Sequence, residues 1–228
     1  IISGLVGSEM CIRDRFNINM YSQETTTRTL GEFEEIKVYD LINVELIKSK
    51  ENKITISGKH AQDVSVKQKN NTLKIKMKLK KMFSGSETNV KVYYRSLDVI
   101  DANQGAVVTS IDPIKQYELK LKAQEGAYIL ANAETKILEI KSVTGGTIET
   151  EGMSSKQKVK ITTGGIYKGS KLLAENTDLD IKTGGKADVN TKKVLDIKIF
   201  SGGDVFIYGT PKQLKQRKVF GGRIMFKD

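Results

Sequence analysis

Residues 161–205 read ITTGGIYKGSKLLAENTDLDIKTGGKADVNTKKVLDIKIFSGGDV, and within this stretch a short glycine turn recurs at a nearly constant distance. The same turn continues on both sides of it. Its first glycine is residue 126, 145, 164, 184, 202 and 221, so successive turns are 19, 19, 20, 18 and 19 residues apart. Gln104-Gly105 extends the series back by another 21 residues. A fixed period of about 20 residues is typical of a solenoid.

Apolar and polar residues alternate on both sides of each turn. The apolar positions before the turns are Ile140/Ser142, Val159/Ile161, Leu179/Ile181 and Ile197/Ile199, and those after them are Ile148/Thr150, Ala187/Val189, Val205/Ile207 and Ile224/Phe226. A period of two predicts two short strands per repeat, which meet at the glycines. One repeat departs from the pattern because Tyr167 and Gly169 occupy its apolar positions. We expect a one-residue slip there that turns Ile166 inward.

The glycines are predicted to be structural corners. Successive coils of a solenoid stack about 4.8 Å apart, and glycine turns sharply at positive φ while letting neighbouring backbones approach. A phosphate cradle is disfavoured because no Gly-Lys-Ser/Thr motif follows the turns. The predicted corner residues are Gly126, Gly145, Gly146, Gly164, Gly165, Gly184, Gly185, Gly202, Gly203, Gly221 and Gly222.

The fold class predicted from this repeat is all-β. We expect a single-stranded β-helix, or solenoid, with coils of about 19–20 residues and glycine corners. A right-handed coil is favoured because parallel crossovers are right-handed as a rule. A β-sandwich with hairpins at the glycines is the alternative, but sandwiches rarely keep so strict a period.

The composition favours an anionic partner. The 228 residues include 38 Lys and Arg against 27 Asp and Glu, which gives a formal net charge of +11 and a pI near 9.5. Nucleic acid, an acidic polysaccharide, lipopolysaccharide and a membrane surface all fit this charge. Cys11 is the single cysteine, so an intrachain disulfide is excluded. No apolar run reaches the roughly 18 residues of a membrane-spanning helix.

The N-terminal region does not follow the repeat. Residues 1–15 are interpreted as a translated sequencing-adapter artefact, and residues 16–22 as the end of a truncated signal peptide cleaved after Ser22 or as an ordinary lead-in. Residues 23–30 are polar and are expected to be a flexible lead-in. Residues 31–228 then form one domain, with an N-terminal capping part at 31–96 and glycine-cornered repeats at 97–228.

Lysines alternate with apolar residues in the predicted strand at residues 73–81. One side of this strand carries Lys74, Lys76, Lys78 and Lys80. This cationic side is a candidate anion-binding face for phosphates or uronates, with salt-sensitive affinity. It can equally protect an exposed strand from edge pairing. No aromatic residues are interleaved with these lysines, so a nucleic-acid partner is not expected.

The residues that could carry catalysis or bind a metal are few. His60 is the only histidine, so histidine-based metal clusters are excluded. We assign His60 a role in a turn. Four aspartates in the repeats invite comparison with calcium sites, but Lys160 and Lys198 occupy the neighbouring positions and favour a surface ion-pair ladder. These aspartates are Asp178, Asp180, Asp196 and Asp204. We expect no catalytic, cofactor-binding or metal-binding residues.

The last two repeats carry a more specific pattern. Residues 199–211 read IFSGGDVFIYGTP, residues 219–224 read VFGGRI, and the opening residues 31–38 read GEFEEIKV before Val44-Glu45-Leu46. These motifs resemble the auto-transporter adhesin head GIN domain family over about residues 31–226. The family's usual Gly-Ser-Gly turns are mostly Thr-Gly-Gly here.

This resemblance implies a β-helix, export beyond the inner membrane in bacteria of the Bacteroidetes type, and an adhesive or surface-binding role without catalytic residues. We therefore expect a non-catalytic secreted or cell-surface binding module whose partner is an anionic glycan or another cell-surface ligand, with homo-oligomerisation through a prism face. Two alternatives stay open. One is a polymerising or membrane-associated scaffold, and the other is a polysaccharide-active β-helix enzyme.

Overall fold

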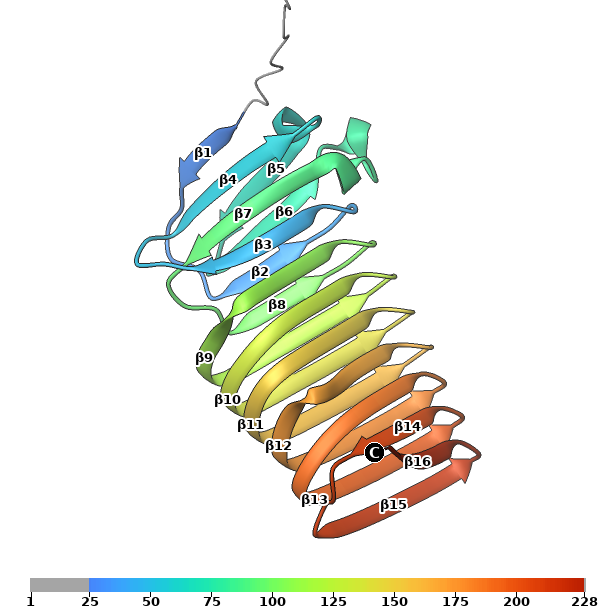
Figure 1. The fold of residues 1–228 in the computed structure, drawn as a ribbon. Coiled ribbons are helices and arrows are strands. Elements are labelled where there is room, and N and C mark those ends of the chain that lie inside the picture. The colour runs from blue at the N-terminus through green and yellow to red at the C-terminus, as the bar shows by residue number, and fades with distance from the viewer. Residues whose placement is uncertain (1–24, 228) are drawn as a thin grey trace, which may run out of the picture.

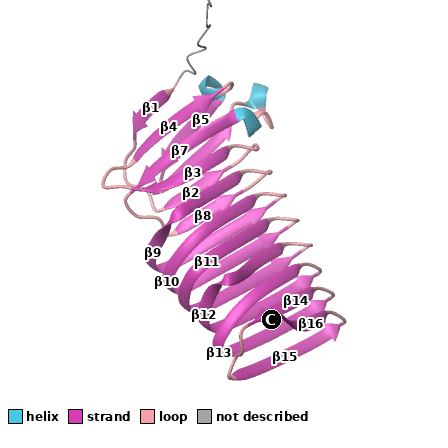
Figure 2. Cartoon of the chain, viewed as in Figure 1, coloured by secondary structure: helices cyan, strands magenta, loops and turns pink. Residues whose placement is uncertain are grey.

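The computed structural model describes residues 25–227 as a stack of β-coils, running from the N-terminal strands at one end to β15 and β16 at the other (Figure 1). Strands make up most of residues 25–227, which also contain three short 3-10 helices (Figure 2). These are η1 (Ala61–Asp63), η2 (Leu79–Lys81) and η3 (Gly85–Glu87). The strands are β1 (Thr26–Thr29), β2 (Glu35–Val38), β3 (Asn43–Lys48), β4 (Lys53–Gly58), β5 (Val64–Lys69), β6 (Thr72–Met77), β7 (Thr88–Tyr94), β8 (Val99–Ala102), β9 (Val107–Gln124), β10 (Tyr128–Val143), β11 (Thr147–Thr162), β12 (Ile166–Thr183), β13 (Lys186–Ser201), β14 (Asp204–Tyr208), β15 (Gln213–Phe220) and β16 (Arg223–Lys227).

Each coil contributes one strand segment to each of two faces. Face A consists of β5, β6, β2, β8, the second halves of β9 to β13, and β15; face B consists of β1, β4, β7, β3, the first halves of β9 to β13, β14 and β16. Parallel pairing aligns Lys122 with Lys141 and Lys141 with Lys160, each 19 residues on. The β-solenoid with coils of about 19–20 residues is therefore confirmed.

The glycine turns form the corner at which face A passes into face B. At Thr144 and Gly145 the φ values are +48° and +71°, as in a type I′ turn, and the Gly145 N–H donates to the Thr163 carbonyl of the next coil at 3.2 Å. A Cβ added at Gly146 would lie less than 3.0 Å from the Ala123 backbone. The first glycine thus supplies the turn, and the second lets adjacent coils approach.

The interior is a ladder of apolar side chains, and it includes Tyr167. Ile148, Tyr167 and Ala187 are register partners, and Tyr167 is fully buried, whereas Ile166 faces outward and is half-buried. The expected slip was therefore wrong. Gly169 leaves the space that the inward Tyr167 ring occupies, because a Cβ at residue 169 would lie less than 3.0 Å from this ring. The Tyr167 hydroxyl is hydrogen-bonded to Thr150 Oγ1 at 2.7 Å.

The N-terminal part stacks out of sequence order. The coil formed by β2 and β3 lies between the coil of β6 and β7 and that of β8 and β9. Three antiparallel pairings, β1 with β4, β4 with β7 and β5 with β6, close this end of the stack. Strand β1 occupies part of the expected flexible lead-in. The interpretations of residues 1–15 and 16–22 concern residues outside the described range.

The edge opposite the glycines is made by continuous but bulged strands. The coil-to-coil register shifts between Ala131 and Ala133, between Glu149 and Glu151, and between Gly169 and Leu173. Because the extra residues bend the strands, this edge carries the chain from face B to face A of the next coil.

Candidate functional site

The predicted lysine face at residues 74–80 is only partly formed. Lys74 and Lys76 are half-buried in β6, but the strand ends at Met77, and Lys80 lies in η2 beside an exposed Leu79. The expectation of one strand through residue 80 was wrong, because the β5 partner begins at Val64, opposite Met77, and offers no residue to pair with the chain beyond it.

The two ends of this predicted face also make different contacts. The Lys74 ammonium lies 4.6 Å from the centre of the Tyr39 ring, whereas Lys78 Nζ donates to the Gln62 carbonyl at 2.7 Å. The four lysines therefore do not present one uninterrupted cationic surface.

A longer row of cations crosses face A from coil to coil. We call this row the basic column; each of its residues is the register partner of the next one in the neighbouring strand. Its members are Lys67, Lys74, Lys37, Asp101, Lys122, Lys141, Lys160, Asp180, Lys198 and Arg217. Asp101 is buried and accepts a hydrogen bond from Asn103, whereas Asp180 is half-buried. The two aspartates divide the column and leave Lys122, Lys141 and Lys160 as an uninterrupted cationic segment.

The neighbouring column alternates in charge over Lys120, Glu139 and Lys158, and two registered aspartates, Asp178 and Asp196, follow. Glu139 lies between Lys120 and Lys158, with Oε–Nζ distances of 2.7 and 3.0 Å. Hydrogen bonds from Lys120, and then from Lys158, hold the pKa of Glu139 below its usual range. By contrast, within residues 25–227, Lys122, Lys141 and Lys160 have no carboxylate within salt-bridge distance.

The aspartates compared with calcium sites mostly face cations. Asp178 pairs with Lys156 at 3.2 Å and Asp196 with Lys198 at 3.9 Å. Asp204 accepts two hydrogen bonds from the Arg223 guanidinium, at 2.7 and 2.6 Å, and its pKa is lowered by them. No group of three or more acidic, histidine or cysteine side chains that could hold a metal ion occurs within the described residues.

His60 lies at the turn before η1. Its Nδ1 atom is 3.8 Å from the Asp63 carboxylate, so the contact is at most a weak local one. This position beside a 3-10 turn agrees with the role assigned from the sequence.

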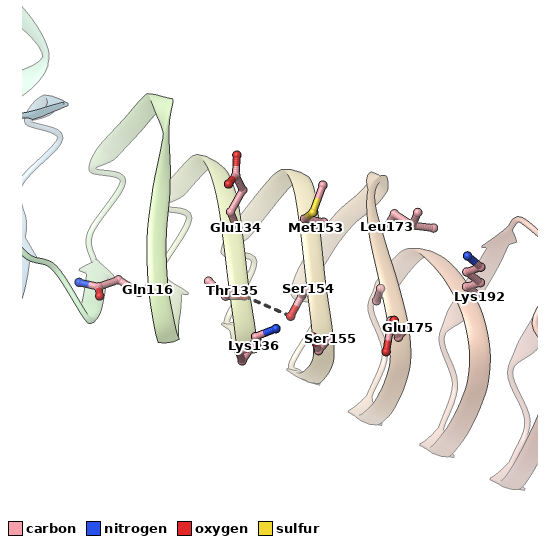
Figure 3. Close-up of a pocket in the computed structure, with 11 residues that line it drawn as sticks. Gln116, Glu134, Thr135, Lys136, Met153, Ser154, Ser155, Leu173, Glu175 and Lys192 are labelled. Atoms are coloured by element: carbon pink, nitrogen blue, oxygen red, sulfur yellow. Dashed lines mark hydrogen bonds between the residues drawn. The ribbon is translucent and has the colours of Figure 1, made fainter.

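A groove on the bulged edge was not anticipated. Figure 3 shows side chains of successive coils lining it, and its volume is about 370 Å³. Met153 and Leu173 are register partners in it and are 60% and 47% exposed. Charged residues border them, with Glu134 paired to Lys115 at 2.9 Å and Glu175 to Lys193 at 3.0 Å. In the sequence these groove residues are visible only as two apolar residues, Met153 and Leu173, 20 positions apart. Their outward direction follows from the bulges in the strands.

The fold is shared with solved structures of low sequence identity. A putative adhesin from Bacteroides fragilis superposes with a TM-score of 0.83 at 17% identity, covering 91% of this chain and 98% of the other. A putative adhesin from Parabacteroides merdae gives 0.70 at 18% identity, covering 90% and 96%. A putative lipid binding protein from Parabacteroides distasonis gives 0.71 at 17% identity, covering 90% and 97%.

Sequence comparison identifies the family. No curated protein matches the chain. The structure adds one finding to this comparison: no helix among the described residues has the length and apolarity needed to cross a membrane.

The family model described as "Putative auto-transporter adhesin, head GIN domain" matches residues 32–211. The chain belongs to this family of putative auto-transporter adhesins with a head GIN domain.

Proposed function

We propose that this protein is a non-catalytic binding module, exported and exposed at the surface of a bacterial cell, that holds its ligand on the extended faces of the solenoid. The observation that carries the proposal is the regular register of outward side chains on face A, which repeats chemically similar groups over successive coils. Such a surface is suited to a ligand that is itself extended and repetitive.

Family membership and the similar folds support an adhesive role, and the charge of the chain supports an anionic ligand. A hydrolase or lyase has less support, because Asp178, Asp196 and Asp204 lie in ion pairs with lysine or arginine. Asp178, Asp180 and Asp196 do line one shallow depression, but Lys158, Lys160 and Lys198 line it with them. A retaining or inverting glycosidase needs two carboxyl groups that flank one bond.

The face A strand of the last described coil argues against a polymerising scaffold, although Ile224 and Phe226 keep the interior positions of its face B strand apolar. Gln216 and Lys218 of β15 are the register partners of the buried Ile197 and Ile199, so polar side chains stand at interior positions. Inward-pointing polar and charged residues at the end of a sheet oppose the addition of another strand. End-to-end stacking of copies on this coil would bury the Lys218 ammonium.

Binding of the fluorescently labelled chain to bacterial and epithelial cells, and to an array of neutral and acidic glycans, tests the proposal. We expect saturable binding that unlabelled protein competes away, and no release of reducing ends or unsaturated sugars on prolonged incubation with calcium. Absence of saturable binding on every surface would refute the binding role, and release of sugar products would refute the non-catalytic one.

A further inference from the structure

Three lysines stand in register on face A at a cost to the fold. Lys122, Lys141 and Lys160 are direct partners in adjacent coils, which stack about 4.8 Å apart. Like charges directly opposite one another on neighbouring strands are destabilising. The adjacent Lys120, Glu139 and Lys158 avoid this cost by alternating in sign. Folding alone therefore gives no reason for the unpaired row.

A shallow depression adjoins two of these lysines, Lys141 and Lys160. Its volume is about 190 Å³, and it is lined by Lys120, Glu139, Ile140, Lys141, Lys158 and Lys160. Glu139 is held by Lys120 and Lys158, so the ammonium groups of Lys141 and Lys160 carry the unneutralised charge. A second depression of about 270 Å³ shares Lys158 and Lys160 with the first, but Asp178, Asp180 and Asp196 also line it. The cationic part of this surface therefore ends at Lys160.

The spacing of the row limits the kind of polyanion that fits. Three lysines cover about 10 Å with one cation per coil. One strand of duplex DNA carries a phosphate every 3.4 Å or so along its axis, which is denser than the row. A polysaccharide with one anionic group per sugar has its charges spaced more widely.

The surrounding side chains also suit sugars better than nucleobases. The outward positions next to the row, towards the glycine corner, are Gln124, Val143 and Thr162. Single-stranded nucleic acids are held by aromatic stacking platforms, and these positions are polar or aliphatic. Hydroxyl and amide groups can hydrogen-bond to sugar hydroxyls.

We infer that Lys122, Lys141 and Lys160 form a binding track for a linear acidic polysaccharide, which lies along the solenoid axis with one anionic group per coil. This inference rests on the proposed surface-binding function and assigns its ligand class and site. It moves the anion-binding face from the predicted β6 lysines to the centre of face A. Asp101 and Asp180 mark the two ends of the track.

The test compares the full chain with two triple variants of equal charge change. The track variant is K122Q/K141Q/K160Q, and the matched control is K50Q/K171Q/K212Q, whose lysines are exposed and lie away from the track. Affinity for polygalacturonate, heparin, dextran and an oligothymidylate is measured between 50 and 200 mM salt. Thermal melting is recorded for each protein without ligand.

We expect the wild type to bind polygalacturonate or heparin but neither dextran nor the oligothymidylate. The track variant should bind about tenfold more weakly, as expected for the loss of three surface charge contacts, of which Lys141 and Lys160 are exposed and Lys122 is half-buried. The slope of log affinity against log salt should fall by about two. Its melting temperature should stay the same or rise, because repulsion is relieved. Glu139→Gln, which releases Lys120 and Lys158, should strengthen binding.

Other outcomes are equally decisive. Equal losses in both triple variants would show that net charge alone acts, and would overturn the track. Tight binding of the oligothymidylate through the same lysines would replace the polysaccharide by nucleic acid. Binding to cells or to other glycans that the track variant retains in full would leave the surface-binding function intact while refuting this site. A lower melting temperature of the track variant would instead indicate a structural role for the lysines.

Discussion

Replacing Gly169 by alanine tests how β12 accommodates its unusual inward tyrosine. Gly169 lies outside the positive-φ region, so its backbone tolerates a side chain, but a Cβ there would lie less than 3.0 Å from the Tyr167 ring. Tyr167 is fully buried, and its hydroxyl is hydrogen-bonded to Thr150 and Gln157, so the ring cannot swing aside without losing these partners. Overpacking of this kind costs about 1–3 kcal/mol.

The sign of the effect should reverse once the ring is removed. In a Tyr167→Val background the atoms that clash with the new Cβ are gone, and valine occupies the equivalent position at Val205. Gly169→Ala should then stabilise the strand by about 0.5–1 kcal/mol, which is the usual advantage of alanine over glycine in a strand. The coupling energy between the two sites is therefore about 1.5–4 kcal/mol.

Guanidinium unfolding of the wild type, both single variants and the double variant, followed by circular dichroism, measures this coupling. In the wild-type background a loss of 1–3 kcal/mol should lower the melting temperature by roughly 3–9 °C. An unchanged dependence on denaturant would show that only stability has altered. Equal costs of Gly169→Ala in both backgrounds would refute the idea that glycine is present to make room for the tyrosine.

Three further predictions concern the corners and one buried charge. Thr163→Asn should raise the unfolding free energy by about 1 kcal/mol, seen as a higher melting temperature, because a β-branched residue is strained at its φ of +52° and asparagine is not. Gly145→Ala should cost about 1–2 kcal/mol from its φ of +71° alone, and Gly146→Ala should cost more in the same unfolding assay, because its Cβ meets the Ala123 backbone; equal costs would contradict the two roles. Burial raises the pKa of Asp188 by more than Lys186 and Lys168 lower it; Lys186 Nζ lies 3.8 Å from Oδ1, which has no hydrogen-bond partner within the described residues. The fold therefore loses stability as pH rises through the unfolded pKa of about 3.9 and the carboxyl group ionises. Asp188→Asn should therefore be more stable than wild type at pH 7 and lose that advantage below about pH 4, and a melting curve that shows no such pH dependence would refute this account.

The repeat could be predicted from the sequence because its cause is local. Each corner needs a residue that adopts positive φ and a second one without a side chain, and the chain meets both needs with glycines such as Gly145 and Gly146. The alternation on either side of each corner, as at Val159 and Ile161, follows from strand geometry alone. Coil length and the inward-facing residues of the regular repeats were therefore predictable.

The sites depended on contacts between residues distant in sequence. The run of lysines in β6 suggested a cationic face within one strand, yet the chain leaves the sheet after Met77, where its pairing with β5 ends. Whether Tyr167 or Ile166 points inward was decided by the space at Gly169 and by hydrogen bonds to other coils. Local periodicity ranks each position by its polarity alone. It therefore reveals neither the room that Gly169 leaves within the same strand nor the hydrogen-bond partners Thr150 and Gln157, which lie in β11.

The amino-acid sequence by itself determined the solenoid, its period and its corners, since these follow from the backbone preferences of glycine and from the two-residue repeat of a strand. Only the tertiary structure decided that Lys122, Lys141 and Lys160 stand in one unpaired row while Lys120 and Lys158 are neutralised by Glu139. The physical reason is that a shift of one residue in a strand moves every side chain to the opposite face. The charge pattern of the surface therefore depends on the exact register between coils.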